Sequence, residues 1–157
     1  MKILVIEDSR FLRTAIERLL VKAGYEVTSI ADGREALAAA RKTLPSLILL
    51  DMMLPGLEGT GVMKELKQDG VTSQIPVIVL TGLSQKNESK LKRAGAAGYI
   101  EKSSIDFGKN ADPLFQAIAG VIGKGEDFLR PERQTRSTAK AETAISEGRV
   151  GAPEGAA

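Results

Sequence analysis

The stretch that decides the fold is LILLD, at residues 47–51, in which four large apolar residues end at an acidic one. Four further runs rich in Ile, Val and Leu share its character: ILVI at 3–6, YEVTSI at 25–30, VIVL at 77–80 and GYI at 98–100. Short apolar runs that alternate with helical segments are typical of parallel strands covered on both faces. The sequence therefore predicts an α/β fold, with a doubly wound, five-stranded parallel sheet and helices on both of its faces.

The segments between these runs carry apolar residues at helical spacing. Asp32 is a predicted N-cap, and Gly24 and Gly95 follow predicted helices as stop signals. Asp112, followed by proline, opens a last predicted helix that ends near Gly123. From residue 125 onward few large apolar residues remain. We therefore predict one domain over residues 1–124 and a mostly disordered tail over residues 125–157.

The amino-acid composition narrows the possible functions of the chain. Its 157 residues include no cysteine and no histidine, which excludes Cys and His nucleophiles, histidine bases and zinc ribbons. The formal net charge of +2 is too small to favour direct binding of nucleic acid by phosphate neutralisation. No apolar run reaches the ~18 residues of a membrane span, and the N-terminal run is too short for a signal peptide. We therefore expect a cytoplasmic protein with no membrane insertion and no direct contact with nucleic acid.

Polar residues follow the predicted strands, at the edge where open parallel sheets bind their ligands. They are Glu7 and Asp8 after the first strand, Asp51 after the third, Thr81 after the fourth and Lys102 after the fifth. Taken one at a time, each has a purely structural explanation. Asp8 or Ser9 would cap the first helix, Thr81 is a good strand residue, and Lys102 would be a solvated loop charge.

Taken together, the three acids predict a metal site. Carboxylates that lie close together repel one another and raise one another's pKa unless a divalent cation neutralises them. Mg²⁺ prefers such hard oxygen ligands and keeps several waters. Asp51 is the natural nucleophile, since carboxylates form aspartyl phosphates, and phosphorus is the electrophile that fits best. Lys102 would then pair with one phosphoryl oxygen, and the Thr81 hydroxyl would bond another.

The same residues resemble the receiver domains of two-component response regulators, over about residues 1–123. The matching elements are the acidic pair in VIEDS, Asp51 in ILLDMMLPGLEG, Thr81 in VIVLTG and Lys102 in GYIEKS. The resemblance implies a flavodoxin-like strand order, 2-1-3-4-5, in a stand-alone receiver. It also implies a regulatory phosphoacceptor, and not an enzyme beyond its own phosphorylation and dephosphorylation. The donor would be the phosphohistidine of a sensor histidine kinase or of a phosphotransfer protein.

The resemblance also implies how Mg²⁺ is held. Asp8, Asp51 and the backbone carbonyl of Met53 would be ligands, and Glu7 would help through water. Receivers usually have a cis proline after the lysine, whereas this chain has Ser103. A cis bond at a residue other than proline costs about 2.5–4 kcal/mol, so we expect the loop after Lys102 to follow a different path.

A switch and an output face are implied as well. Tyr99 matches the aromatic switch position, at which the ring orientation accompanies movement of Thr81. An unknown downstream protein would bind at the fourth helix, around residues 85–93, together with the fifth strand and the last helix. Two other functions are open at this point. An aspartyl phosphatase is disfavoured because Met53 stands where such enzymes need an acid/base residue, and a phosphorylation-independent scaffold would leave the acceptor set unused.

Overall fold

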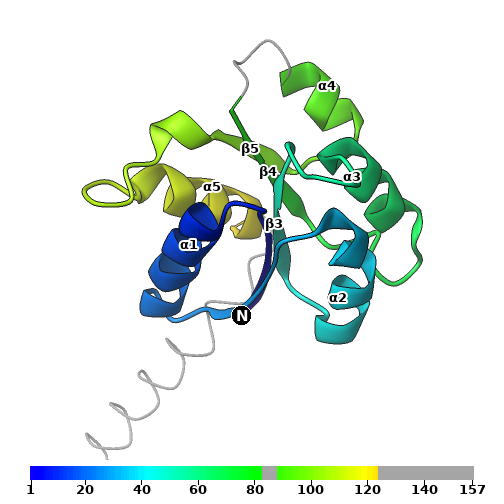
Figure 1. Cartoon of the computed structure of the whole chain (residues 1–157), viewed down its shortest axis with the longest axis horizontal. Helices are drawn as coiled ribbons and strands as arrows, with labels where there is room; N and C mark the ends of the chain where they lie inside the picture. The colour runs from blue at the N-terminus through cyan, green and yellow to red at the C-terminus, as the bar shows by residue number, and fades with distance from the viewer. Residues whose placement is uncertain (83–87, 124–157) are drawn as a thin grey trace, which may run out of the picture. The chain divides into compact units, whose positions relative to one another are not determined.

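The computed structural model describes residues 1–82 and 88–123 of the chain (Figure 1). Its sheet has five strands in the order β2-β1-β3-β4-β5, and every neighbouring pair is parallel. The strands are β1 (Lys2–Ile6), β2 (Glu26–Ile30), β3 (Leu47–Asp51), β4 (Val77–Thr81) and β5 (Gly98–Glu101). The predicted fold class and strand order are therefore both confirmed.

Helices cover both faces of this sheet. Figure 1 shows α1 (Arg10–Lys22) and α5 (Asp112–Ile122) on one side, and α2 (Ala36–Thr43) and α3 (Gly59–Gln68) on the other. The fourth helix, α4, is described over Glu88–Arg93, so the first part of the predicted helix at 85–93 lies outside the described residues. Among the described residues, no helix combines the length and the apolar character that a membrane crossing requires.

The chain divides into two compact units, Met1–Val121 and Ile122–Ala157. The first unit holds the whole sheet. The predicted tail over 125–157 lies outside the described residues, and the boundary at residue 124 stays a prediction.

Alternation along the strands explains why the sheet is covered on both faces. Leu4, Ile6, Ile48, Leu50, Val77 and Val79 belong to one buried cluster with residues of α2 and α3. The residues between them, such as Val5 and Leu49, are also fully buried, and successive side chains of a strand point to opposite faces. Strand β2 lies at the edge and is mostly half-buried. The inner strands consequently fix the position of whatever follows them.

Strands β3, β4 and β5 end one residue beyond the apolar runs that predicted them. Asp51 pairs with Leu80, and Thr81 pairs with Glu101, in the parallel ladders. Asp51 and Thr81 are thus the last residues of β3 and β4 and are fixed by backbone hydrogen bonding, not carried on loops. This difference from the sequence prediction places both side chains more rigidly than a loop position would.

The predicted helix signals are resolved in detail. Ser9 caps α1, because its hydroxyl accepts a hydrogen bond from the Leu12 backbone N–H at 3.3 Å. Asp32 caps the short 3₁₀ helix η1 (Gly33–Glu35) that leads into α2. Gly24 and Gly95 end their helices with φ values of 95° and 104°, which L side chains rarely adopt. Of the two predicted caps, Ser9 is therefore the one that caps α1, and the Asp8 carboxylate is left for another role.

Candidate functional site

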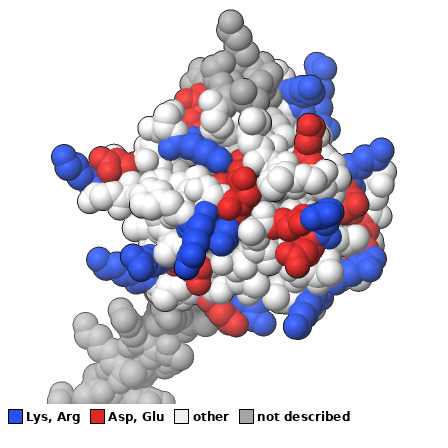
Figure 2. Space-filling view, viewed as in Figure 1, with Lys and Arg blue, Asp and Glu red and all other residues white. Residues whose placement is uncertain are grey.

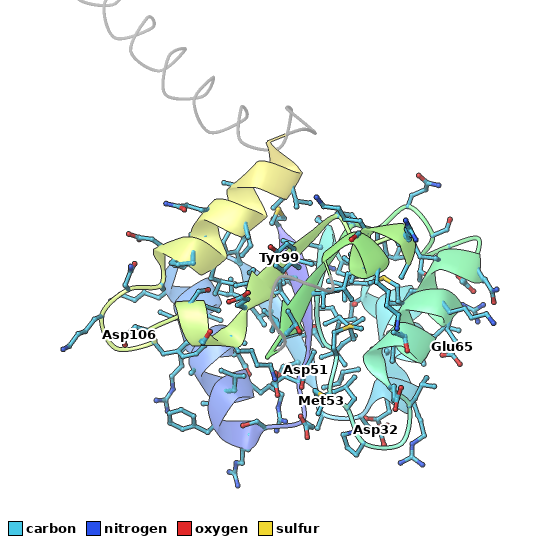
Figure 3. All side chains as sticks on the ribbon, turned by 90° about the horizontal axis from the view of Figure 1, so that it is seen from above. Asp32, Asp51, Met53, Glu65, Tyr99 and Asp106 are labelled. Atoms are coloured by element: carbon cyan, nitrogen blue, oxygen red, sulfur yellow. The ribbon has the colours of Figure 1, made fainter. Side chains whose placement is uncertain are left out.

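The three predicted acids meet at the carboxyl edge of the sheet. Glu7 and Asp8 follow β1, and Asp51 ends β3, the neighbouring strand. Each offers a carboxylate oxygen, and these oxygens all lie within 4.8 Å of one another. Figure 3 shows Asp51 and Met53 together at this edge, with Asp32 beyond them. The side chains that the sequence predicted to converge are thus brought together.

The three acids differ in burial. Glu7 and Asp51 are fully buried, whereas Asp8 is exposed. Glu7 Oε1 accepts a hydrogen bond from the Ser9 backbone N–H at 3.1 Å, and Asp51 Oδ1 accepts one from the Met53 N–H at 3.0 Å. The acceptor side of the site is therefore sheltered, and its open side carries Asp8.

Lys102 supplies the counter-charge to the buried acids. Its Nζ lies 2.9 Å from Asp51 Oδ1 and 3.1 Å from Glu7 Oε2. The lysine side chain is 26% exposed, so these ion pairs are only partly screened by solvent. Figure 2 shows acidic and basic residues interspersed over the face in view, with neither sign dominating it. The face in view therefore carries no broad region of a single charge sign.

Burial and charge shift the pKa values of this group. Burial, together with the charge of Asp51, raises the pKa of Glu7 to about 7, although Lys102 and the Ser9 N–H oppose this shift. Burial lowers the pKa of Lys102, but its hydrogen bond to Asp51 and the charges of Glu7 and Asp51 outweigh burial, so the pKa is raised. One ammonium group does not compensate two buried carboxylates, and this imbalance favours a further cation.

The donor atoms fit a hard divalent cation. Asp51 Oδ2 is buried and has no hydrogen-bond partner among the described residues. Glu7 Oε2 likewise makes no hydrogen bond, although it lies beside Lys102. A buried carboxylate oxygen without a partner costs free energy unless a cation or water satisfies it. With Asp8 on the open side, these oxygens form an acidic cluster that is compatible with Mg²⁺.

Arg13 is a site residue that the sequence analysis missed. Its Nη1 donates hydrogen bonds to the backbone carbonyls of Glu7, at 2.9 Å, and of Asp8, at 3.3 Å. The guanidinium thereby ties the first turn of α1 to the backbone that carries the two acids. The available signal was a basic residue one turn into the helix that follows the acidic pair, but that signal alone does not show where the side chain reaches.

Thr81 lies on β4, the strand next to β3, and Tyr99 lies on β5, the edge strand beyond it. Thr81 ends β4 and is 2% exposed. Tyr99 of β5 pairs with Val79 of β4, is half-buried, and packs against the buried cluster that includes residues of α2 and α3. Figure 3 shows Tyr99 further from the carboxyl edge than Asp51. Thr81 therefore borders the acidic cluster, and Tyr99 lies deeper along the sheet.

The loop after Lys102 follows a compact path. The peptide bond before Ser103 is trans, and residues Lys102–Ser104 form a 3₁₀ helix, η3. The Ser104 hydroxyl donates to the Glu101 carbonyl at 2.7 Å, and an Asp106–Asn110 bridge closes the turn that follows. Lys102 reaches Asp51 from this arrangement without a cis bond.

The backbone at Gly59 packs closely against the backbone of Asp51 and Met52, at the start of the loop that follows β3. A Cβ atom at Gly59 would lie 2.6 Å from Met52 Cα and 2.8 Å from the Asp51 carbonyl oxygen. We expect Gly59→Ala to lower the free energy of unfolding by about 1–3 kcal/mol, the usual cost of overpacking. Urea unfolding checks this, with Gly70→Ala as the control because a Cβ there meets no atom within 4 Å. Equal midpoints for the two variants would contradict the expectation.

Comparison with known proteins gives a consistent result. A family model described as the response regulator receiver domain matches residues 3–109. The probable transcriptional regulator ycf27 of Porphyridium aerugineum is 42% identical over 102 residues, which are 64% of this chain and 41% of that protein. The chain thus spans less than half the length of this curated relative.

Solved structures resemble the chain over most of the described residues. Chemotaxis protein CheY4 of Vibrio cholerae matches with a TM-score of 0.68 and 31% identity, covering 76% of this chain and 97% of that one. The receiver domain of sensor histidine kinase PA1611 from Pseudomonas aeruginosa matches with a TM-score of 0.66 and 31% identity, covering 78% and 97%. In that structure a magnesium ion is coordinated in the active-site cleft.

Proposed function

Because the chain belongs to the response regulator receiver domain family, a family of phosphoacceptor signalling switches, we propose that Asp51 is its phosphoryl acceptor. The donor in this proposal is a phosphohistidine on a sensor histidine kinase or on a phosphotransfer protein. The supporting observation is the environment of Asp51. One of its oxygens lies 2.9 Å from Lys102 Nζ, and the other is buried without a hydrogen-bond partner among the described residues.

In the proposed transfer, a carboxylate oxygen of Asp51 forms a bond to phosphorus while the bond from phosphorus to the donor's imidazole nitrogen breaks. The electron pair of the broken bond stays on the imidazole, and Asp51 becomes an aspartyl phosphate. Lys102 pairs with one phosphoryl oxygen, and the Thr81 hydroxyl, at the end of the adjacent strand, bonds another. The ammonium group is already in place beside the acceptor, so it need not reorganise during transfer.

We assign Mg²⁺ to the acidic cluster. Asp8, Asp51 and the backbone carbonyl of Met53 would hold the ion, with Glu7 acting through water. When bound, Mg²⁺ supplies positive charge that offsets the carboxylates and the oxygens of the phosphoryl group. Glu7 and Arg13 position this set: Glu7 through its bond to the Ser9 N–H, and Arg13 through the backbone carbonyls of the acidic pair.

The output of the switch is assigned to the face formed by α4, β5 and α5. Movement of Thr81 toward the phosphoryl group would change the packing next to β5, and Tyr99 on that strand would respond. The downstream protein that binds this face is unknown. The basic residues Lys90, Lys92 and Arg93 near the end of α4 would favour an acidic partner surface. In this proposal the chain catalyses only its own phosphorylation and dephosphorylation, in the cytoplasm.

The proposed chemistry is tested by incubating the full chain with acetyl phosphate and reading its intact mass. With Mg²⁺ we expect a gain of one phosphoryl group per chain, because Asp51 is the only acceptor proposed. With EDTA in place of Mg²⁺ we expect little or no gain, because the crowded carboxylates would then repel the anionic donor. Equal labelling with and without Mg²⁺ would contradict the role assigned to the acidic cluster.

A further inference from the structure

A cavity of about 520 Å³ opens beside the acidic cluster. Asp8 and Thr81 line the cavity on the side nearest Asp51, so these two residues belong to both the cavity and the candidate site. Its other walls come from the loop after β3, from the first turn of α3 and from α4. Pockets of about 300–1,000 Å³ are typical of sites for small molecules. The cavity is far larger than a single phosphoryl group needs.

The walls of this cavity are largely apolar. Met52, Met53, Leu54 and Pro55 line one part, and Leu91 of α4 and Ala94, in the turn after α4, line another. Leu54 and Leu91 are each 6% exposed and belong to the core, so these two walls are backed by packed side chains. Lys90, also on α4, adds an ammonium group to the lining, and Asp8 and Glu58 add carboxylates. The apolar part of this lining matches a short apolar chain.

We propose that this cavity receives the acyl group of an acyl phosphate, and that the chain therefore prefers aliphatic acyl phosphates of about four carbons over acetyl phosphate. The inference rests on the proposed function, since it concerns the donor to Asp51. An Asp51 oxygen forms the new bond to phosphorus, and the bond from phosphorus to the acyl oxygen breaks. Its electron pair leaves with the carboxylate product, so no oxidant, reductant or further reactant is needed.

Position and charge support this assignment. In phosphoryl transfer the attacking and leaving oxygens are roughly in line with phosphorus, so the leaving group lies on the open side of the acceptor. Asp8 and Met53, which border that open side, are the exposed members of the cavity wall next to Asp51. The leaving carboxylate gains negative charge as the bond breaks, and of the charged groups that line the cavity the Lys90 ammonium, not Asp8 or Glu58, would stabilise it.

The test compares rates of phosphorylation by butyryl phosphate and acetyl phosphate at equal concentration, with Mg²⁺ and intact-mass detection. Butyrate and acetate are leaving groups of nearly equal basicity, so the two donors differ mainly in apolar length. Each buried methylene favours binding by about fourfold. We therefore expect the rate ratio of butyryl to acetyl phosphate to be about 5–15 for the unsubstituted chain.

Variants that fill the cavity test whether the acyl chain binds there. Ala94→Leu, in the turn after α4, and Thr60→Leu, on α3, each add apolar volume at an exposed wall residue and should bring the rate ratio toward one. Ala119→Leu, at an exposed position of α5 outside the cavity lining, is the matched control and should keep the full ratio. Circular dichroism and thermal unfolding establish that each variant folds.

The outcomes separate this inference from the proposed function. A ratio near one in the unsubstituted chain, with normal labelling by acetyl phosphate, would overturn the donor preference alone. A ratio that stays unchanged in both Ala94→Leu and Thr60→Leu would also overturn it, because the acyl chain would then not bind in the cavity. Absence of labelling by either donor would overturn both proposals together.

Discussion

A chain that carries Asp51→Asn takes up no phosphoryl group from acetyl phosphate and Mg²⁺, whereas the unsubstituted chain takes up one. The amide lacks the anionic oxygen that attacks phosphorus, and no other acid occupies the same position. Glu7 is buried and already accepts a hydrogen bond from the Ser9 N–H, and Asp8 is exposed on the open side of the cluster. Intact mass and site mapping of the modified chain measure the result.

Asp106→Asn provides the matched control for that variant. Asp106 is an exposed aspartate in the loop after η3, and its Oδ1 accepts hydrogen bonds from the Gly108 and Lys109 backbone N–H groups, which an asparagine oxygen also accepts. This variant should be labelled like the unsubstituted chain. Circular dichroism should show that Asp51→Asn keeps the fold, because asparagine has nearly the same shape as aspartate. Full labelling of a folded Asp51→Asn chain would refute the acceptor assignment.

The second large effect is expected at Lys102. We expect Lys102→Met to slow phosphorylation by about 10²–10³-fold, the usual loss when a group that stabilises transition-state charge is removed. The same substitution should leave Mg²⁺ affinity equal or higher, because the ammonium group and the cation compete for the carboxylates of Glu7 and Asp51. Stopped-flow labelling and calorimetric titration with Mg²⁺ measure the two quantities separately.

This separation distinguishes a role in catalysis from a role in structure. Lys109→Met removes an exposed lysine of the same loop region that has no carboxylate partner in the described ion pairs, and it should change neither quantity. A general disturbance of the carboxyl edge would weaken Mg²⁺ binding and phosphorylation in parallel. Parallel losses in Lys102→Met would therefore show that the lysine holds the site together and does not act on the phosphoryl group.

The fold was predictable because apolar patterning and topology act together. Runs such as LILL have no polar residue, so they require cover on both faces, and a parallel sheet brings the ends of such strands to one edge. This rule alone placed Asp51, Glu7 and Lys102 near one another. It could not give the extra strand residue at Asp51 and Thr81, because ladder pairing and not hydrophobicity ends those strands.

Other parts of the site depend on how far side chains reach. Arg13 is one of several basic residues in the first helix, and only three-dimensional packing shows that its guanidinium reaches back to two carbonyls. The cavity beside the site depends on the separation between α4 and the loop after β3, which no periodicity encodes. The unpartnered oxygen of Asp51 is likewise invisible in sequence, since it follows from burial and from the direction of the neighbouring N–H groups.

The alternation of strands and returning helices also places the candidate site at one edge of the sheet and the turns that tolerate change at the other. Every strand delivers its last residue to the carboxyl edge, so the turns that follow the helices, at Gly24, Leu44 and Gly70, lie at the opposite edge. Gly70 is exposed with open space around it, and Leu44 is exposed in a left-handed turn. The two edges of the sheet therefore differ in what they tolerate. A reporter can be inserted or a turn lengthened at the edge that carries Gly24, Leu44 and Gly70, whereas small changes at the carboxyl edge would alter the proposed chemistry.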